Sequence, residues 1–334
     1  MNLNKRLLVF AELGEYLSED IFKVNDKELY RAEIFNPWFT QENIKYSLLN
    51  WSKLLNKEML SSWLIPYKLD DLPNNKNVLI IMAGNIPLVG FHDLLTALIC
   101  GCNVTIKMSS NDSILIKLII QKLIEIDNSY SEYISFIDDL NERYFDAVIT
   151  AGSNNSSRYF NYYFKDIPKI IRKNRCSIAI LDGNETELEL KGLAKDIFLY
   201  FGLGCRNVSK LFLPSGYDLD LLFNHFYKYA KLLEHKKYAN NYDYYKAIHL
   251  LGKHKLIENG FLLMKEDKSL FSPISMLYYE FYNDRLSVNN FLNDNTDNIQ
   301  SIISRKDIPF GEAQRPKLWD YADNIDTVDF IKKI

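Results

Sequence analysis

The middle of the chain alternates between short apolar runs and amphipathic segments of helix length. The apolar runs have the character of buried strands and cover residues 77–82, 103–107, 147–150 and 177–181. The helix-patterned segments between them cover residues 88–100, 113–126 and 156–164. This alternation predicts a parallel sheet flanked by helices, and we therefore expect an α/β fold.

Polar residues follow three of these predicted strands. They are Asn85, Lys107 and the pair Gly152-Ser153. Ligands bind such sheets at the carboxyl ends of the strands, so these residues mark a candidate binding edge. The sequence contains neither a Gly-x-Gly-x-x-Gly fingerprint nor a phosphate-binding P-loop, so the usual nucleotide motifs do not identify the ligand.

A cysteine lies in a glycine-rich turn further along the chain, where residues 200–207 read Tyr-Phe-Gly-Leu-Gly-Cys-Arg-Asn. Gly202 and Gly204 interrupt an apolar, helix-patterned segment just before Cys205 and leave room for a substrate beside the main chain. A helix beginning at Cys205 would favour its thiolate. Taken alone, the pattern favours a buried cysteine packed after a turn over a nucleophile.

Composition excludes several classes of protein. The net charge of -3 gives no reason to expect a nucleic-acid partner, and no apolar run approaches the roughly 20 residues of a membrane helix. The first residues are amphipathic and carry acids, unlike a secretory signal. The four cysteines lack the spacing of a metal site or a disulfide framework. We expect a cytoplasmic protein without a metal.

The length of 334 residues suggests about two domains. Helical periodicity from about residue 4 to residue 64 predicts an N-terminal helical layer. We expect this layer and a cofactor-binding domain within residues 1–190, a second α/β catalytic domain at 191–308, and a C-terminal segment, 309–334, that returns to the cofactor domain. The strands predicted for the second domain cover residues 209–214, 254–257, 261–264 and 275–279, and a helix is predicted at 219–233.

Four segments resemble motifs of one family, in the order of that family. Residues 82–88 resemble the Pro-Trp-Asn-Phe-Pro segment of aldehyde dehydrogenases, and residues 104–110 resemble their Val-Val-Leu-Lys-Pro-Ser-Glu strand. Residues 150–153 are similar to their Phe-Thr-Gly-Ser turn, and residues 202–205 to their Gly-Gln-x-Cys nucleophile loop. Each match is weak alone, but four in register over about 120 residues are specific.

The residues in these motifs are most similar to those of the acyl-CoA reductase branch of the aldehyde dehydrogenase superfamily. This branch is the LuxC type, typified by the fatty-acid reductase of bacterial luminescence. The resemblance covers residues 79–316. It implies an aldehyde dehydrogenase fold and the reduction of a fatty acyl thioester to an aldehyde. It also implies acyl-CoA or another acyl thioester as substrate, an acyl-activating enzyme as a partner, and a homo-oligomer.

The resemblance assigns roles to the motif residues. Cys205 is the expected acyl acceptor, and Asn85 the expected side-chain donor to the tetrahedral oxyanion, beside the Cys205 backbone amide. Lys107 is expected to contact the cofactor ribose, and Gly152 with Ser153 to border its pyrophosphate.

Departures from the family motifs sharpen these expectations. Ser109 and Ser110 are expected to lie against the cofactor, and Ser110 replaces an acid that would repel a 2′-phosphate, which favours NADP(H). Ser269 replaces a glutamate that grips the nicotinamide ribose in relatives. Residues 172–177 contain no carboxylate where hydrolysing aldehyde dehydrogenases have their general base, so the acyl-enzyme is expected to survive water.

Two alternatives remain open. The same cysteine could serve an acyltransferase or thioesterase without redox chemistry, or the chain could be a non-catalytic scaffold that has kept the fold. The basic residues Arg172, Lys173 and Arg175 fit a solvated face better than a phosphate site.

Overall fold

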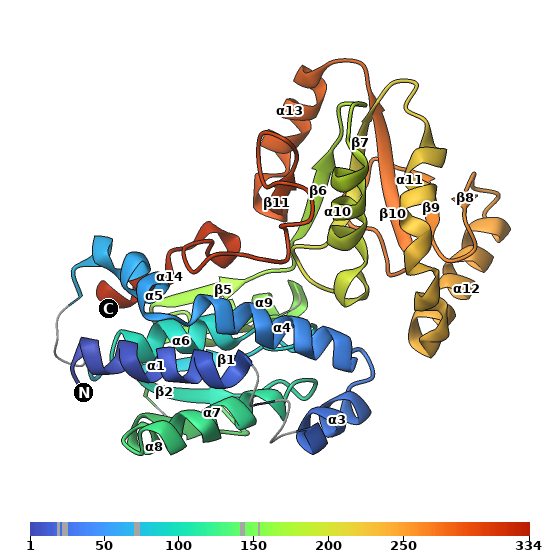
Figure 1. Ribbon diagram of the computed structural model, residues 1–334. Helices are drawn as coiled ribbons and strands as arrows, with labels where there is room; N and C mark the ends of the chain where they lie inside the picture. Colours follow the sequence, from blue (N-terminus) through green and yellow to red (C-terminus); the bar gives the residue numbers. More distant parts are fainter. Residues whose placement is uncertain (19–20, 22–25, 70–73, 141–143, 153) are drawn as a thin grey trace. The chain divides into compact units, whose positions relative to one another are not determined.

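The computed structural model describes residues 1–18, 21, 26–69, 74–140, 144–152 and 154–334 (Figure 1). The chain forms two compact units. The first combines Met1–Asn174 with Lys317–Ile334, and the second comprises Arg175–Pro316. The last residues therefore belong to the same unit as the first. No helix among the described residues has the length and apolar character needed to cross a membrane.

The first unit is built on a parallel sheet, sheet A, with the strand order β3-β2-β1-β4-β5. Its strands are β1 (Asn77–Ile81), β2 (Asn103–Lys107), β3 (Ile134–Phe136), β4 (Ala147–Ala151) and β5 (Lys169–Arg172). The predicted parallel sheet is confirmed, and three of its strands lie where the apolar runs place them. The short strands β3 and β5 are additions to the prediction.

Side chains of β1 alternate between two hydrophobic layers, as the pleat of a strand requires. Val78 and Ile80 belong to the main core of the unit, and Leu79 and Ile81 to a smaller cluster that Phe160 packs against on the opposite face. The main core also contains residues of helices α1 (Leu3–Ser18), α3 (Asp26–Phe35), α4 (Gln41–Leu54), α5 (Lys57–Leu64), α6 (Phe91–Ile99) and α7 (Leu115–Ile126). The N-terminal helical layer is confirmed.

The end of the chain packs into this layer. The indole nitrogen of Trp63 donates to the Tyr321 hydroxyl at 2.7 Å, and the Tyr67 hydroxyl donates to Asp326 at 2.6 Å. Helix α14 (Thr327–Lys332) lies against α6, and Val328 and Ile331 are buried in the main core. Both chain ends are labelled beside this helical layer in Figure 1.

The second unit is built on sheet B, with the strand order β11-β6-β7-β10-β9-β8. All pairs are parallel except β8 with β9. The strands are β6 (Cys176–Ile180), β7 (Val208–Pro214), β8 (Ile257–Glu258), β9 (Leu263–Glu266), β10 (Met276–Tyr282) and β11 (Ile299–Ile303). The placing of residues 177–181 in the first sheet is wrong, because β6 pairs with β7 and β11.

Two hydrophobic clusters cover the faces of sheet B. Leu211 and Leu213 join a cluster with α10 (Glu187–Phe198) and α11 (Leu219–Phe226), and Phe212 joins another with Val288 of α13 (Arg285–Asp294). Residues 238–245, for which the sequence predicts no element, lie within α12 (Lys236–Leu251). The remaining helical segments are η1 (Ile65–Tyr67), α8 (Tyr130–Tyr133), α9 (Asn154–Tyr163), η2 (Leu199–Gly202), η3 (Tyr227–Glu234), η4 (Thr296–Asn298) and η5 (Ala322–Asn324).

Candidate active site

The loop that contains Asn85, residues 82–90, lies against the loop after β2 at the carboxyl ends of the sheet A strands; we call it the Asn85 loop. The Met82 amide donates to the Lys107 carbonyl at 3.0 Å. Gly84 faces Ser109 so closely that a Cβ on Gly84 would lie 2.5 Å from the Ser109 hydroxyl oxygen. Only glycine fits here without moving its neighbour, which explains the glycine of the motif.

Asp112 fastens these two loops together. Its Oδ2 accepts the Leu88 amide at 2.8 Å, and Leu88 itself has a left-handed backbone with φ of 61°. The side chain is buried, and Oδ1 has no hydrogen-bond partner among the described residues. Burial raises the pKa of Asp112 to about 7. Sequence reasoning missed this residue, because a single aspartate after a strand carries no pattern of its own.

The structure brings most of the predicted cofactor residues to one edge of sheet A. Lys107 ends β2, and its ammonium donates to the Asp138 carbonyl in the segment after β3. Ser109 and Ser110 follow in the same loop, with the Ser109 hydroxyl accepting the Asn111 amide at 3.2 Å. Gly152 directly follows β4, and α9 begins two residues later. Ser153 lies outside the described residues.

Cys205 lies in the second unit, in a turn between η2 and β7. No helix begins at Cys205, so the expected contribution of a helix dipole to its thiolate is wrong. Three consecutive residues before the turn, Tyr200, Phe201 and Gly202, have φ of 54°, 58° and 77°. Left-handed backbone is unfavourable for the two aromatic residues, so the surrounding structure must impose this path.

Asn207 holds the cysteine turn. Its Oδ1 accepts the Gly204 amide at 2.8 Å, and its backbone amide donates to the Gly204 carbonyl at 3.0 Å. The Ser177 hydroxyl in β6 donates to the Cys205 carbonyl at 3.0 Å. Asn207 and Ser177 are buried. Both were missed by the site prediction, although Asn207 closes the eight-residue run in which the cysteine was found.

The four cysteines differ in their surroundings. Cys100, Cys102 and Cys176 are buried, whereas Cys205 is partly exposed. Burial raises the pKa of Cys102 to about 12 and that of Cys176 to about 11. The buried thiols are therefore held in their neutral form, and Cys205 is the cysteine that a reagent or substrate can reach.

The predicted solvated basic cluster is partly wrong. Arg172 is buried and meets both carboxylate oxygens of Asp93, with Nη2 to Oδ1 at 2.6 Å and Nε to Oδ2 at 3.2 Å. Its Nη1 also donates to the Ala322 carbonyl at 2.6 Å. Arg172 therefore joins β5, α6 and the C-terminal segment. Its guanidinium is engaged within the first unit.

Lys210 in β7 supports the segment that contains Ser269. Its ammonium donates to the Asp267 carbonyl at 2.6 Å and lies 3.0 Å from Oε2 of Glu280. The Ser269 carbonyl accepts a further bond at 3.4 Å. The Lys210 side chain is fully buried, and burial lowers its pKa. The segment that contains Ser269 is therefore held by the buried ammonium of Lys210.

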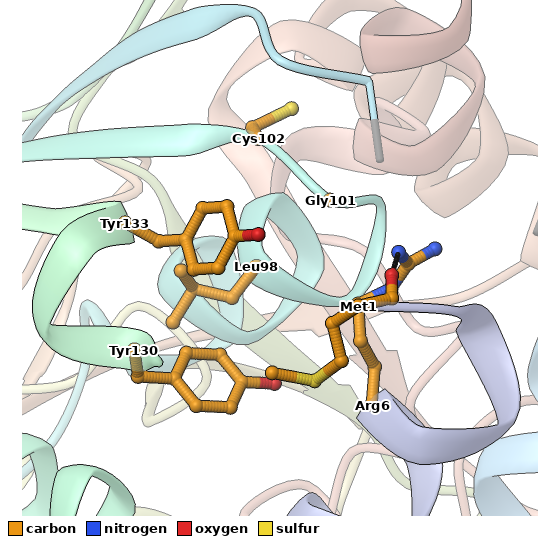
Figure 2. Close-up of a pocket in the computed structure, with 7 residues that line it drawn as sticks. All are labelled: Met1, Arg6, Leu98, Gly101, Cys102, Tyr130 and Tyr133. Carbon is orange, nitrogen blue, oxygen red and sulfur yellow. Dashed lines mark hydrogen bonds between the residues drawn. The ribbon is translucent and has the colours of Figure 1, made fainter. Parts of the chain in front are cut away.

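A pocket lies at the opposite, amino-terminal end of β2 (Figure 2). It is lined by Met1, Arg6, Leu98, Gly101, Cys102, Tyr130 and Tyr133. Nη1 of Arg6 donates to the Met1 carbonyl at 2.6 Å, whereas Nη2 and the Tyr130 hydroxyl have no partner among the described residues. Gly101 and Cys102 precede β2 and Lys107 ends it, so the pocket is separate from the predicted binding edge. The described residues contain no cluster of three metal-ligating side chains.

Solved structures with the same fold are aldehyde dehydrogenases. Aldehyde dehydrogenase 21 from Physcomitrella patens, in complex with the reaction product succinate, matches with a TM-score of 0.67 at 13% identity over 91% of this chain and 74% of that one. The Mycobacterium tuberculosis enzyme complexed with NAD⁺ gives 0.64 at 14% identity over 88% and 71%. The NAD⁺ complex from Bacillus cereus gives 0.64 at 13% over 91% and 72%. The chain thus has the aldehyde dehydrogenase fold, as predicted.

The family follows from the sequence. The acyl-CoA reductase (LuxC) family matches residues 17–221, which is more than half of the chain and includes Asn85, Lys107, Gly152 and Cys205. The chain belongs to this family, and it is an oxidoreductase of the acyl-CoA reductase type. No curated protein matches it.

Proposed function

We propose that this protein reduces a fatty acyl thioester such as an acyl-CoA to the aldehyde, with NADPH as reductant and Cys205 as the acyl acceptor. Family membership supports the reaction type. The observation that carries the role of Cys205 is its contrast with the other three cysteines: it alone of the four is partly exposed, in a turn held by buried polar side chains.

The first chemical step forms a thioester on the protein. The Cys205 thiolate attacks the acyl carbonyl, and the carrier thiol leaves with the electron pair of the broken carbon–sulfur bond. The negative charge that develops on the carbonyl oxygen requires donors already in place. We assign this role to the Cys205 backbone amide and the Asn85 side chain.

The first unit suits a nicotinamide dinucleotide. Gly152 has no side chain to cover the backbone at the end of β4, and α9 begins at Asn154, so the pyrophosphate would meet a helix N-terminus. We assign Lys107, Ser109, Ser110, Gly152 and Ser153 to cofactor binding. When bound, NADPH would supply the hydride that converts the thioester to the aldehyde. Ser110 in place of an acid supports NADP(H) over NAD(H).

Water must not consume the acyl-enzyme before reduction. The segment from Arg172 to Ser177 has no carboxylate to act as a general base. Arg172, its first residue, is occupied by Asp93, and Ser177, its last, donates to the Cys205 carbonyl. This supports a reductase, or an acyltransferase, over an enzyme that hydrolyses its intermediate.

The experiment is oxidation of NADPH in the presence of short, medium and long-chain acyl-CoA. We expect acyl-CoA-dependent loss of the nicotinamide absorbance, and transfer of a radiolabelled acyl group to Cys205. Cys205→Ala should abolish both, and Cys176→Ala serves as the matched control because that thiol is buried. Undiminished labelling of Cys205→Ala would refute the proposal. Labelling without NADPH oxidation would indicate the acyltransferase alternative.

We also propose that an acyl-activating enzyme supplies the thioester, that the protein is a homo-oligomer and that it is located in the cytoplasm. Size-exclusion chromatography with light scattering tests the oligomeric state, and co-purification from cells tests the partner.

A further inference from the structure

Asn207 makes two hydrogen bonds to Gly204, one through its side chain and one through its backbone amide. The side-chain Oδ1 accepts the Gly204 amide at 2.8 Å, and the Asn207 backbone amide donates to the Gly204 carbonyl at 3.0 Å. The second bond closes a four-residue turn in which Cys205 is the second residue. Both peptide groups that flank Gly204 are therefore fixed by the same asparagine.

The peptide group between Gly204 and Cys205 carries both the carbonyl that Asn207 binds and the backbone N–H of Cys205. A trans peptide is planar, so its carbonyl and its amide hydrogen point in opposite directions. Because the Gly204 carbonyl is bound to the Asn207 amide, the plane cannot rotate, and the direction of the Cys205 N–H is fixed with it. An N–H that serves as an oxyanion donor needs a fixed direction of this kind.

The Asn207 side chain is itself immobilised at the end of α10. Its Nδ2 donates to the carbonyls of Asp196 at 3.0 Å, Ile197 at 3.3 Å and Leu199 at 2.8 Å. Helix C-termini leave such carbonyls unsatisfied, so one amide group satisfies several of them at once. Asn207 is 2% exposed, and the bonds at both ends of its carboxamide determine its orientation.

Ser177 fixes the other side of the cysteine. Its hydroxyl donates to the Cys205 carbonyl at 3.0 Å, and its amide donates to the Asn207 carbonyl at 3.2 Å. The peptide that follows Cys205 is therefore held by β6, the strand beside β7. Cys205 thus lies between two peptide planes. The plane before it is held by the Asn207 backbone amide, and the plane after it by the buried Ser177 hydroxyl.

We propose that Asn207 is a positioning residue that aims the Cys205 backbone amide at the oxyanion formed during acyl transfer. This inference rests on the proposed role of Cys205 as the acyl acceptor. Asn207 touches neither substrate nor cofactor in this role and acts through the Gly204–Cys205 peptide.

Two reagents separate this role from a merely structural one. p-Nitrophenyl acetate acylates a thiolate through a tetrahedral oxyanion and expels p-nitrophenolate, whereas iodoacetamide alkylates it by displacing iodide, without an oxyanion. Asn207→Ala keeps the backbone bond to the Gly204 carbonyl but removes the side-chain bonds that hold residue 207 and the Gly204 amide in place. It should slow acylation of Cys205 by at least about tenfold, since losing one oxyanion donor costs about 10²–10³ in rate. Alkylation should change much less. Rates measured on Cys205→Ala are subtracted to remove reaction at other groups.

Asn259→Ala is the matched control in the same unit. The Asn259 side chain accepts the amides of Phe261 and Leu262 at 3.4 and 3.0 Å, as an asparagine that organises a turn away from Cys205. The Asn259→Ala variant should leave the ratio of the acylation rate to the alkylation rate unchanged. An equal loss of both rates in Asn207→Ala would overturn the proposal, because it would show general distortion of the turn.

Ser177→Ala decides the question if Asn207→Ala does not fold. It removes only the bond to the Cys205 carbonyl, and we expect acylation to fall more than alkylation here too; equal changes would overturn the proposal. p-Nitrophenyl acetate requires neither acyl-CoA nor NADPH. Failure of the reductase assay with a normal acylation ratio would therefore count against the proposed function and not against the positioning role.

Discussion

Arg172 and Asp93 form a buried, two-pronged ion pair, with Nη2 to Oδ1 at 2.6 Å and Nε to Oδ2 at 3.2 Å. The pair joins the last residue of β5 to the first turn of α6, and Nη2 also reaches the Thr327 hydroxyl of α14 at 3.0 Å. Burial opposes the charged form of Asp93, but the neighbouring guanidinium overrides it and the pKa of Asp93 lies below its usual value. A residue that looked like part of a solvated basic cluster thus holds three segments together.

Arg172→Met should destabilise the protein by about 3–5 kcal/mol, because it leaves the buried Asp93 carboxylate without a counter-charge. Urea unfolding measures the change. Arg305→Met is the control, since the Arg305–Glu189 pair is far more exposed, and it should lose much less. Similar losses in both variants would contradict the prediction. Since its pKa is lowered, Asp93 contributes stability above its unfolded pKa, and this is lost as pH falls through the folded pKa.

Asp112 gives the opposite pH dependence. Between its ordinary pKa of 3.8 and about 7, the folded chain keeps a proton that the unfolded chain has lost. The free energy of unfolding should therefore fall as pH rises through this window, by up to about 1.4 kcal/mol per pH unit for this group, and level off above it. Asp112→Asn keeps an acceptor for the Leu88 amide and cannot titrate.

Thermal or urea unfolding at several pH values compares the two proteins. Asp112→Asn should show a shallower decline of stability between pH 4 and 7, while Asp196, whose pKa burial also raises to about 7, keeps its own contribution. Identical pH profiles for the variant and the wild-type protein would show that Asp112 does not hold a proton in the folded state.

The fold could be predicted where strands are long and continuously apolar. β1 and β4 come closest to such runs, and β2 and β7 contain polar residues among their apolar ones; each lies close to where the sequence places it. β5 reads Lys-Ile-Ile-Arg and β3 has three residues, so neither is apolar for long enough to be recognised. Strands of two sheets look alike in sequence, which is why β6 was placed in the wrong sheet.

The residues of the candidate site also divide into those that a sequence pattern reveals and those that it does not. Asn85 and Cys205 each follow a glycine, and a glycine beside a polar residue or a thiol can be recognised in the sequence. Both residues could therefore be singled out. Their catalytic roles stay predictions. Asp112 and Asn207 act on the main chain of other loops. Such bonds exist only after the chain has closed on itself, and a pattern of residue types does not reveal them.

Gly84→Ala should weaken cofactor binding. The added Cβ would lie 2.5 Å from the Ser109 oxygen and 3.0 Å from the Asp112 amide, so the Asn85 loop and the loop after Lys107 must separate. The KM for NADPH should rise several-fold, with titration calorimetry as an independent measure. Because Ser109 is itself assigned to the cofactor, Ser109→Gly is the reference for the double variant. With the Ser109 side chain removed, Gly84→Ala should raise KM less than it does in the wild-type protein. An equal rise in both backgrounds would show that the clash with Ser109 is not the cause.

Tyr321→Phe should destabilise the first unit by about 1–3 kcal/mol. The Trp63 indole N–H donates to the Tyr321 hydroxyl at 2.7 Å, and Trp63 is 1% exposed, so the variant leaves a buried donor without its acceptor. Chemical unfolding measures the loss. Tyr144→Phe is the control, because Tyr144 is 82% exposed and should change stability little. Equal stability of the two variants would contradict a role for this bond in holding the C-terminal segment.

Thiol counting tests the contrast among the cysteines without any assumption about substrate. Under native conditions a brief exposure to iodoacetamide should modify one thiol per chain, at Cys205, because Cys100, Cys102 and Cys176 are buried and burial raises the pKa of each thiol. In denaturant all four should react. Cys205→Ala should show no rapid reaction when native, whereas Cys176→Ala should behave like the wild-type protein. Peptide mapping that places the fast label on Cys176 would remove the basis for assigning Cys205 as the nucleophile.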